Sequence, residues 1–556
     1  MAEVISRERS ATSPTTNKTG TYIEVPVQDT IPIIFFPGIM GSNLFNTEMK
    51  QSVWKLGNGA GILITVKNQM NKTPAILQQE LDPENTIVDN NGTIKVDSRL
   101  KITEKVLRER GWGTVHWDSY GGVLTYLQLV LNNVDLNQKF EINGKGGLSG
   151  IHQLQKKEAS FEWQSILTKG VTQQKWNPQN PLVQITQEEI LHLKNFNFPV
   201  YAMGYNWLRS SEDAATLAVK KLDEIKKSLG KRFHKFIIVT HSMGGLVARR
   251  LAILKANDIA GVIHNVMPAE GAPLAYRRIV TGAGDAGTGA SLVMGKSTEH
   301  MTAVLGNAPG GLELLPTKGY NQGKPWLFLK GSGHIVSLPS KGDPYEEIYE
   351  ANGVWWEMVK EELLDPLKKS KESPKKVYNN KIKLVKIFHE EIESRYHVNT
   401  YVSYGHNEDQ NSFGSVTWTL DKHVARFSAE QMKRLPRASH KDIENYNKKI
   451  VNDSLKKPEP YKYVKENIKK NNGVRYIWLS NSTFGTFKIS DPDVDGDGTV
   501  SFQSGRAPLS KPGVKQVFQM TGFNHQEGVA NGYVKRSILY SIVKIIKDNN
   551  IQPKFK

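Results

Sequence analysis

The chain of 556 residues contains no cysteine, which excludes disulfide bonds, thiolate metal sites and a cysteine nucleophile. It also lacks long apolar runs, because no stretch approaches the roughly 20 residues that a bilayer crossing needs. Residues 1–28 are rich in serine, threonine and charge and have no apolar core of a secretory signal. We therefore expect a flexible N-terminal arm on a protein that is soluble when made and suits a reducing or an oxidising compartment.

Acidic residues are in the minority, since 73 lysines and arginines face 55 aspartates and glutamates and give a formal net charge of +18. A positive surface attracts anionic partners, and on charge alone nucleic acid and anionic lipid both fit. Apolar residues make up 38% of the chain, which is enough for a sizeable core. The length allows several domains or one large domain with insertions.

Residues 235–250 carry the strongest local signal for chemistry. A β-branched apolar run ends at Thr240-His241-Ser242-Met243-Gly244-Gly245 and passes at once into a helix-forming segment. A strand, sharp turn and helix would hold the Ser242 hydroxyl above the sheet edge as a nucleophile. Thr240 stands where the G-x-S-x-G pattern has its first glycine, and a tight strand-to-helix connection without chemistry is the alternative. Alternation along the strand predicts that His241 points away from Ser242.

Apolar runs and helical patterns alternate through residues 29–556, which predicts an α/β fold with a mostly parallel sheet and helices on both faces. A helix should begin after Ser210 and stop at Gly230. The expected strands are residues 31–36, 199–204, 235–241, 259–266, 397–404 and 517–520. The expected insertions are residues 49–195, 275–390 and 408–480, of which the last is basic.

Two parts of the second insertion allow more than one interpretation. Residues 275–325 are rich in glycine and form either a mobile cover over a site or an ordinary surface loop region. Residues 354–367 predict an aromatic amphipathic helix, which either packs on the body of the protein or touches lipid.

An acid and a base follow Ser242 in the chain order typical of α/β-hydrolases. Asp497 lies between two glycines on an expected turn after a strand. His525 follows the apolar run 517–520 and precedes a terminal helix. The alternating aspartates from Asp491 to Asp497 also resemble a calcium loop, although its twelfth position is not the usual glutamate, so a structural calcium ion is the alternative.

The tetrahedral oxyanion of an acyl transfer needs two backbone donors, each worth about 3 kcal/mol. Met243, directly after the nucleophile, supplies one N–H group. The second is assigned to Ile39, in the loop after the first strand, where Gly38 and Gly41 allow a close approach.

The motifs at residues 37–42, 240–245 and 496–500 resemble those of α/β-hydrolase lipases of the lecithin:cholesterol acyltransferase and GPI inositol-deacylase type. Residues 205–208, 268–278 and 522–526 are similar to segments of bacterial type VI secretion lipase effectors. The resemblance implies cap or lid insertions, a Ser242, Asp497 and His525 triad without a cofactor, and a membrane glycerophospholipid substrate. It further implies delivery with a secretion spike protein to a rival cell, action at the periplasmic side of its membrane, a cognate immunity protein and no nucleic-acid partner.

Two other functions stay open on the sequence alone. The same fold supports an acyltransferase or an esterase for another substrate. A degenerate hydrolase scaffold without catalysis could instead hold nucleic acid or a partner on its basic surface.

Overall fold

A seven-stranded sheet in the order β10-β4-β11-β12-β15-β21-β8 forms the centre of the protein. The computed structural model describes residues 6–11, 20–25, 28–55, 72–136, 150–283, 295, 297–421, 426–439, 442–443, 473–480 and 483–555. The strands are β10 (Val200–Ala202), β4 (Ile33–Phe36), β11 (Phe236–His241), β12 (Ile259–Asn265), β15 (Thr400–Gly405), β21 (Val514–Met520) and β8 (Trp176–Pro178). Neighbouring strands from β10 to β21 are parallel, and only β8 runs antiparallel. The predicted α/β class with a mostly parallel sheet is confirmed.

Successive side chains of the central strands point to opposite faces of the sheet and contribute to two apolar cores, one on each face. Ile34 and Ile238 pack with α7 (Ser211–Leu229) and α8 (Gly244–Leu254). Ile33 and Ile237 pack with α4 (Trp117–Leu131) and α19 (Gly532–Asp548). Because successive residues of a strand face opposite sides, an uninterrupted apolar run is what a sheet covered on both faces requires.

The helix α7 begins and ends where its capping residues predict. The Ser210 side chain accepts the Asp213 N–H group at 3.1 Å, and Gly230 ends the helix with φ of 55°. Glycine adopts a positive φ without a steric penalty, so the chain turns there without strain. This helix delivers the chain to β11 and therefore to Ser242.

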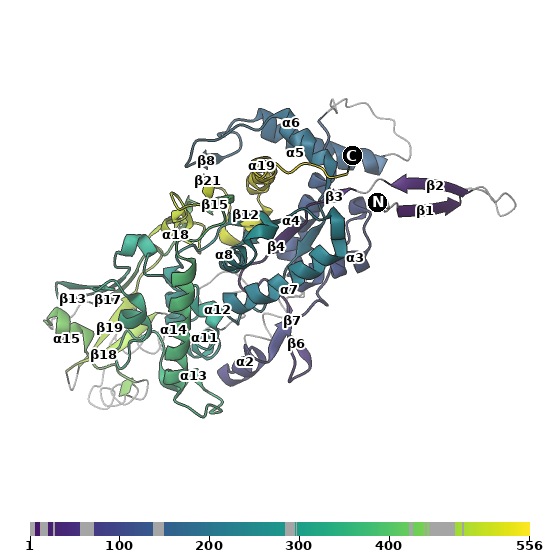
Figure 1. Ribbon diagram of the computed structural model, residues 1–556. Helices are drawn as coiled ribbons and strands as arrows, with labels where there is room; N and C mark the ends of the chain where they lie inside the picture. Colours follow the sequence, from purple (N-terminus) through teal and green to yellow (C-terminus); the bar gives the residue numbers. More distant parts are fainter. Residues whose placement is uncertain are drawn as a thin grey trace.

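Residues 6–11 and 20–25 of the predicted N-terminal arm form strands. Strands β1 (Ser6–Ala11) and β2 (Gly20–Val25) pair as an antiparallel hairpin. The hairpin extends away from the body of the protein (Figure 1). Further along, β3 (Asp29–Thr30) pairs with β9 (Phe196–Asn197).

The range 49–195, interpreted as an insertion, contributes to the central fold. Helix α4 covers one face of the sheet, and β8 forms its edge. The range also contains α2 (Pro74–Glu80), α3 (Glu104–Glu109), α5 (Gly150–Thr168) and α6 (Gln187–His192). Strand β5 (Leu44–Asn46) pairs with β6 (Gln51–Trp54) and β7 (Thr86–Val88) in a small sheet.

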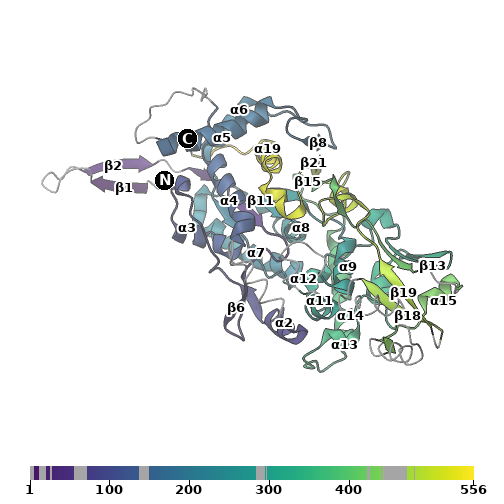
Figure 2. The ribbon, with the colours of Figure 1, turned by 180° about the vertical axis from the view of Figure 1, so that it is seen from behind.

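The other two insertions come together in a second sheet with the order β14-β13-β17-β19-β18. Its strands are β14 (His334–Leu338), β13 (Leu327–Gly331), β17 (Val416–Leu420), β19 (Thr483–Ile489) and β18 (Val474–Ser480). Strand β13 from residues 275–390 pairs with β17 from residues 408–480, so neither range folds as a separate unit. This sheet lies at the end of the molecule opposite to the β1–β2 hairpin (Figure 1, Figure 2).

The described part of residues 275–325 is packed into the first core. Met301, Val304 and Leu312 are buried there with residues of the central strands. The described helices of this region are α9 (Pro273–Thr281), α11 (Thr298–Leu305) and α12 (Pro309–Leu312). Farther along the chain follow α13 (Glu361–Leu364), α14 (Pro374–Ile392) and α15 (Ala429–Lys433). Residues 284–294 of the expected cover and residues 444–472 of the basic insertion lie outside the described residues.

The predicted amphipathic helix over residues 354–367 is wrong, because only α13 is helical there. Trp355 is 1% exposed, stacks on Phe487 with ring centroids 4.0 Å apart, and donates its indole N–H to Met432 O at 2.8 Å. Because it packs against the second sheet, the Trp355 ring is not available for contact with lipid. None of the helices within the described ranges combines the length and apolarity that a bilayer crossing demands.

Replacing Trp355 by alanine should lower the free energy of unfolding by about 3–5 kcal/mol, because a large buried side chain leaves a cavity. Urea unfolding followed by circular dichroism measures this. Ile335→Ala is the matched control, since Ile335 lies in the same sheet but is 59% exposed and should change stability by less than about 0.5 kcal/mol. Equal midpoints for the wild type and Trp355→Ala would contradict the packing role.

Candidate active site

A sharp turn at Ser242 joins β11 to α8. Ser242 has φ of 52°, and its N–H group donates to Asn265 O on the neighbouring strand β12 at 2.9 Å. A Cβ atom on Gly244 would lie 2.4 Å from Pro37 O, so only glycine lets the turn approach the loop after β4. The predicted strand, turn and helix are therefore present, with Ser242 at the carboxyl end of β11.

Thr240, which departs from the G-x-S-x-G pattern, is accommodated by the sheet. Its side chain is buried, and its hydroxyl lies 3.1 Å from His264 Nδ1 on β12. The Asn265 amide also donates to Thr240 O at 2.9 Å. A hydrogen-bonded threonine thus occupies the position without widening the turn.

The structure brings Ser242, His525 and Asp497 together. Nε2 of His525 lies 2.8 Å from Ser242 Oγ, and Nδ1 lies 2.8 Å from Asp497 Oδ2. His525 begins a 3-10 turn, His525–Ala530, after β21, and Asp497 follows β20 (Val494–Gly496). Gly498 has φ of 85°, which makes the turn after Asp497 possible at low cost.

The Asp497 carboxylate has a fixed orientation. Its side chain is 1% exposed, and Oδ1 accepts the N–H groups of Thr499 at 3.0 Å and Val500 at 2.8 Å. A carboxylate only accepts hydrogen bonds, so His525 Nδ1 donates to Oδ2 and Nε2 is left to accept the Ser242 hydroxyl proton. This tautomer is the one that a general base needs.

Asn407, on β16 (Asn407–Ser412), clamps the loops of the acid and the base. Its amide donates to Gly496 O at 2.8 Å and to Phe523 O at 3.1 Å, and its Oδ1 accepts the Gly522 N–H group at 2.6 Å. The sequence analysis missed this residue. The sequence shows only that Asn407 is a polar residue just after the predicted strand 397–404. Many loop residues have this property, so it could not single out Asn407.

The loop after β4 lies against the nucleophile. A Cβ atom on Gly38 would be 2.9 Å from Ser242 Cβ and 3.4 Å from its Oγ. Gly41 N–H donates to Gly38 O at 3.1 Å, which closes a turn through Ile39 and Met40. No hydrogen bond within the described ranges uses the N–H group of Ile39 or Met243. Both groups therefore stay assigned to the oxyanion as a prediction.

The position predicted for His241 is wrong. Its Nε2 lies 2.9 Å from His525 O, and the two imidazole centroids are 5.2 Å apart. Strand alternation fails here because the positive φ at Ser242 rotates the chain directly after His241. His241 therefore lies beside the base.

The aspartates around residue 495 do not converge on one point. Asp493 Oδ1 accepts the Gly414 N–H group at 2.7 Å, Asp495 faces His406 at 3.5 Å, and Asp497 faces His525. In the part of the chain that the structure describes, no three acidic or histidine side chains gather as a metal site would require. The described aspartates of this segment thus have separate partners and form no carboxylate cluster for the calcium ion that the sequence leaves as the alternative.

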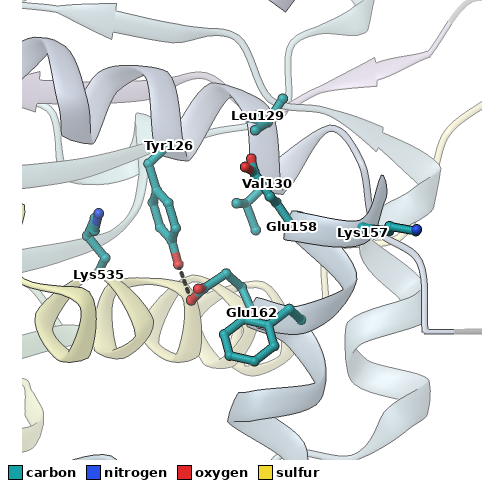
Figure 3. Close-up of a pocket in the computed structure, with 8 residues that line it drawn as sticks. Tyr126, Leu129, Val130, Lys157, Glu158, Glu162 and Lys535 are labelled. Atoms are coloured by element: carbon teal, nitrogen blue, oxygen red, sulfur yellow. Dashed lines mark hydrogen bonds between the residues drawn. The ribbon is translucent and has the colours of Figure 1, made fainter. Parts of the chain in front are cut away.

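A separate cavity of about 440 Å³ lies between α4, α5 and α19 (Figure 3). Tyr126 donates its hydroxyl to Glu162 at 2.9 Å there, and Arg536 pairs with the same carboxylate. Its lining contains no residue of the Ser242, His525 and Asp497 group. Both carboxylates of its lining are paired, Glu158 with Arg99 and Glu162 with Arg536, so we assign no chemistry to this cavity.

Fold and site together define an α/β-hydrolase with a serine, histidine and aspartate at the carboxyl edge of its sheet. Residues 167–283, which include Ser242, match the family described as PGAP1-like alpha/beta domain. The chain is similar to one in the crystal structure of the Tle4-Tli4 complex, with 27% identity, a TM-score of 0.71, and coverage of 93% of this chain and 99% of that one. No curated protein matches the sequence. The predicted resemblance is confirmed.

Replacing Asp497 by asparagine should lower kcat for a soluble ester such as 4-nitrophenyl butyrate by about 10⁴-fold, because an amide N–H facing Nδ1 favours the wrong tautomer of His525. Steady-state kinetics measures the change. Asp495→Asn is the matched control, since this aspartate is two residues away and faces His406, and it should retain activity. Full activity of Asp497→Asn would remove Asp497 from the site.

Proposed function

We propose that the protein is an antibacterial type VI secretion effector that hydrolyses fatty-acyl esters of membrane glycerophospholipids. The main support is the hydrogen-bonded line from Ser242 Oγ through His525 to Asp497, with 2.8 Å at each step. Similarity to Tle4 along 93% of the chain supports the effector class. A serine hydroxyl is a weak nucleophile without a base, and this line supplies one.

The reaction has two halves in this proposal. His525 Nε2 takes the hydroxyl proton as Ser242 Oγ attacks the ester carbonyl, and Asp497 stabilises the imidazolium. The N–H groups of Ile39 and Met243 bind the oxyanion. The imidazolium then protonates the departing lysolipid oxygen and leaves an acyl-enzyme. His525 next removes a proton from water, which attacks the acyl carbonyl, and Ser242 regains its proton as the fatty acid departs.

Charge supports a phospholipid surface as the place of action. The net charge of +18 favours association with anionic headgroups, and this attraction weakens as salt rises. Surface attraction sets how much enzyme reaches the lipid, while the site sets which bond breaks. Delivery with a secretion spike protein, action at the periplasmic side of the target membrane and the absence of a nucleic-acid partner belong to the same proposal.

A cognate immunity protein is the further partner that we propose. The support is that Tle4 has been crystallised in complex with Tli4. A cell that makes a membrane-degrading lipase needs a protein that blocks it, and a complex with the effector is the direct way.

Replacing Ser242 by alanine should lower phospholipid hydrolysis by about a million-fold, because the triad acts as a unit. Vesicles of mixed bacterial phospholipids are incubated with the enzyme, and mass spectrometry measures released fatty acids and lysolipids. Ser228→Ala is the control, since the Ser228 hydroxyl only bonds Ile225 O on helix α7.

Three outcomes separate this function from its rivals. Near-normal hydrolysis by Ser242→Ala would disprove the proposal. New esters formed when an alcohol or sterol is added would identify an acyltransferase. A wild type that neither hydrolyses lipid nor reacts with a fluorophosphonate probe would indicate a binding protein on a hydrolase scaffold.

A further inference from the structure

Two buried side chains outside the triad, Tyr120 and His241, form a line of hydrogen bonds between the loop after β4 and the loop of the base. His241 Nδ1 lies 3.0 Å from the Tyr120 hydroxyl, and His241 Nε2 lies 2.9 Å from His525 O. The Tyr120 hydroxyl also accepts the N–H group of Gly38 at 3.0 Å. The line thus runs from the loop after β4, through helix α4 and the end of β11, to the backbone of the base.

The hydrogen bonds can run in only one direction. His525 O is a pure acceptor, so His241 Nε2 carries a proton. Burial, together with a smaller effect of the nearby His525, lowers the pKa of His241 to about 3, so the ring is neutral and Nδ1 has no proton. Tyr120 must then donate its hydroxyl to Nδ1. Burial raises the pKa of Tyr120, which keeps the phenol protonated for that bond.

The glycines of the loop after β4 leave room for this arrangement. A Cβ atom on Gly41 would lie 2.7 Å from the Tyr120 ring and 2.8 Å from its hydroxyl. One on Gly38 would lie 3.0 Å from His241 Nδ1. A side chain at either position would collide with Tyr120 or His241, so the loop after β4 is fitted closely to these two residues.

We propose that Tyr120 and His241 are positioning residues, which hold the loop of the oxyanion donors and the loop of the base at fixed distances from Ser242. His241 acts as a neutral hydrogen-bond donor to the base loop and does not serve as a second base. Neither side chain touches the reacting atoms. This inference rests on the proposed hydrolase function and adds two residues that the triad does not include.

The effect should appear in kcat more than in KM. The hydrogen bonds of Tyr120 and His241 hold the loop of the oxyanion donors and the loop of His525. Small shifts of groups that stabilise the transition state lower the reaction rate more than they weaken substrate binding. Tyr120→Phe keeps the ring but leaves Gly38 N–H and His241 Nδ1 without their partner. We expect kcat for 4-nitrophenyl butyrate to fall by about 10- to 100-fold, with KM changed by less than about twofold.

Tyr126→Phe is the matched control for this variant. Tyr126 lies on the same helix α4 and loses the same atom, but its hydroxyl bonds Glu162 away from the triad. Its kcat should equal that of the wild type. Titration of reactive serine with a fluorophosphonate probe normalises every rate to correctly folded sites, so that partial unfolding does not imitate the effect.

Variants of His241 test the direction of the line. His241→Gln retains an N–H donor for His525 O and should be more active than His241→Leu, which retains none. In the double variant Tyr120→Phe with His241→Leu, kcat should fall by less than the product of the two single losses, because the bond between Tyr120 and His241 is lost in both single variants.

The outcomes distinguish this inference from the proposed function. Wild-type kcat per titrated site in Tyr120→Phe, while Ser242→Ala is inactive, would overturn the positioning role and leave the hydrolase intact. If the kcat losses of the two single variants multiply in the double variant, Tyr120 and His241 act independently, and the proposed line of hydrogen bonds is overturned. Persistent hydrolysis by Ser242→Ala would instead remove the proposed function.

Discussion

The backbone turn at Ser242 is the constraint on which the rest of the structure depends. A serine with φ of 52° lies in a region that costs about 1–3 kcal/mol for a residue with a side chain. The neighbouring backbone maintains it, because Ser242 N–H bonds Asn265 O and Gly244 lies against Pro37 O. The turn therefore exists only when β4, β11 and β12 are assembled, and the nucleophile is formed by the completed sheet.

The order of the strands explains why the base needs several tethers. Strands β12 and β15 lie between β11, which ends at His241, and β21, which leads to His525. The loop after β21 must reach across both to meet Ser242. Asn407 holds this loop from the end of β15, Asp497 O accepts the His525 N–H group at 2.7 Å, and His241 holds its carbonyl from the end of β11. Each tether comes from one of the strands or loops that the segment crosses.

Local patterns were sufficient to predict the elements that carry the chemistry, but not the contacts between distant segments. The strand before Ser242, the glycines around Asp497 and the strand before His525 are all readable from neighbouring residues. Tyr120 carried no such signal, because its partners Gly38 and His241 lie far away in the chain. The side of His241 was mispredicted because strand alternation ends at the turn. Residues 354–367 were mispredicted as one helix because the second sheet, against which Trp355 packs, is formed by segments far apart in the chain.

Burial and surface charge act on different steps of the proposed reaction. When Ser242 attacks, positive charge develops on His525, and Asp497 is in place to balance it. A second imidazolium beside His525 would oppose that charge, and the burial that keeps His241 neutral prevents this. In the proposed function, the lysines and arginines that give the chain its charge of +18 attract it to anionic lipid, and salt screens this attraction. Salt screens the charges of the buried site far less. In the proposed function, salt therefore changes how often the enzyme meets the membrane more than it changes the rate of ester cleavage.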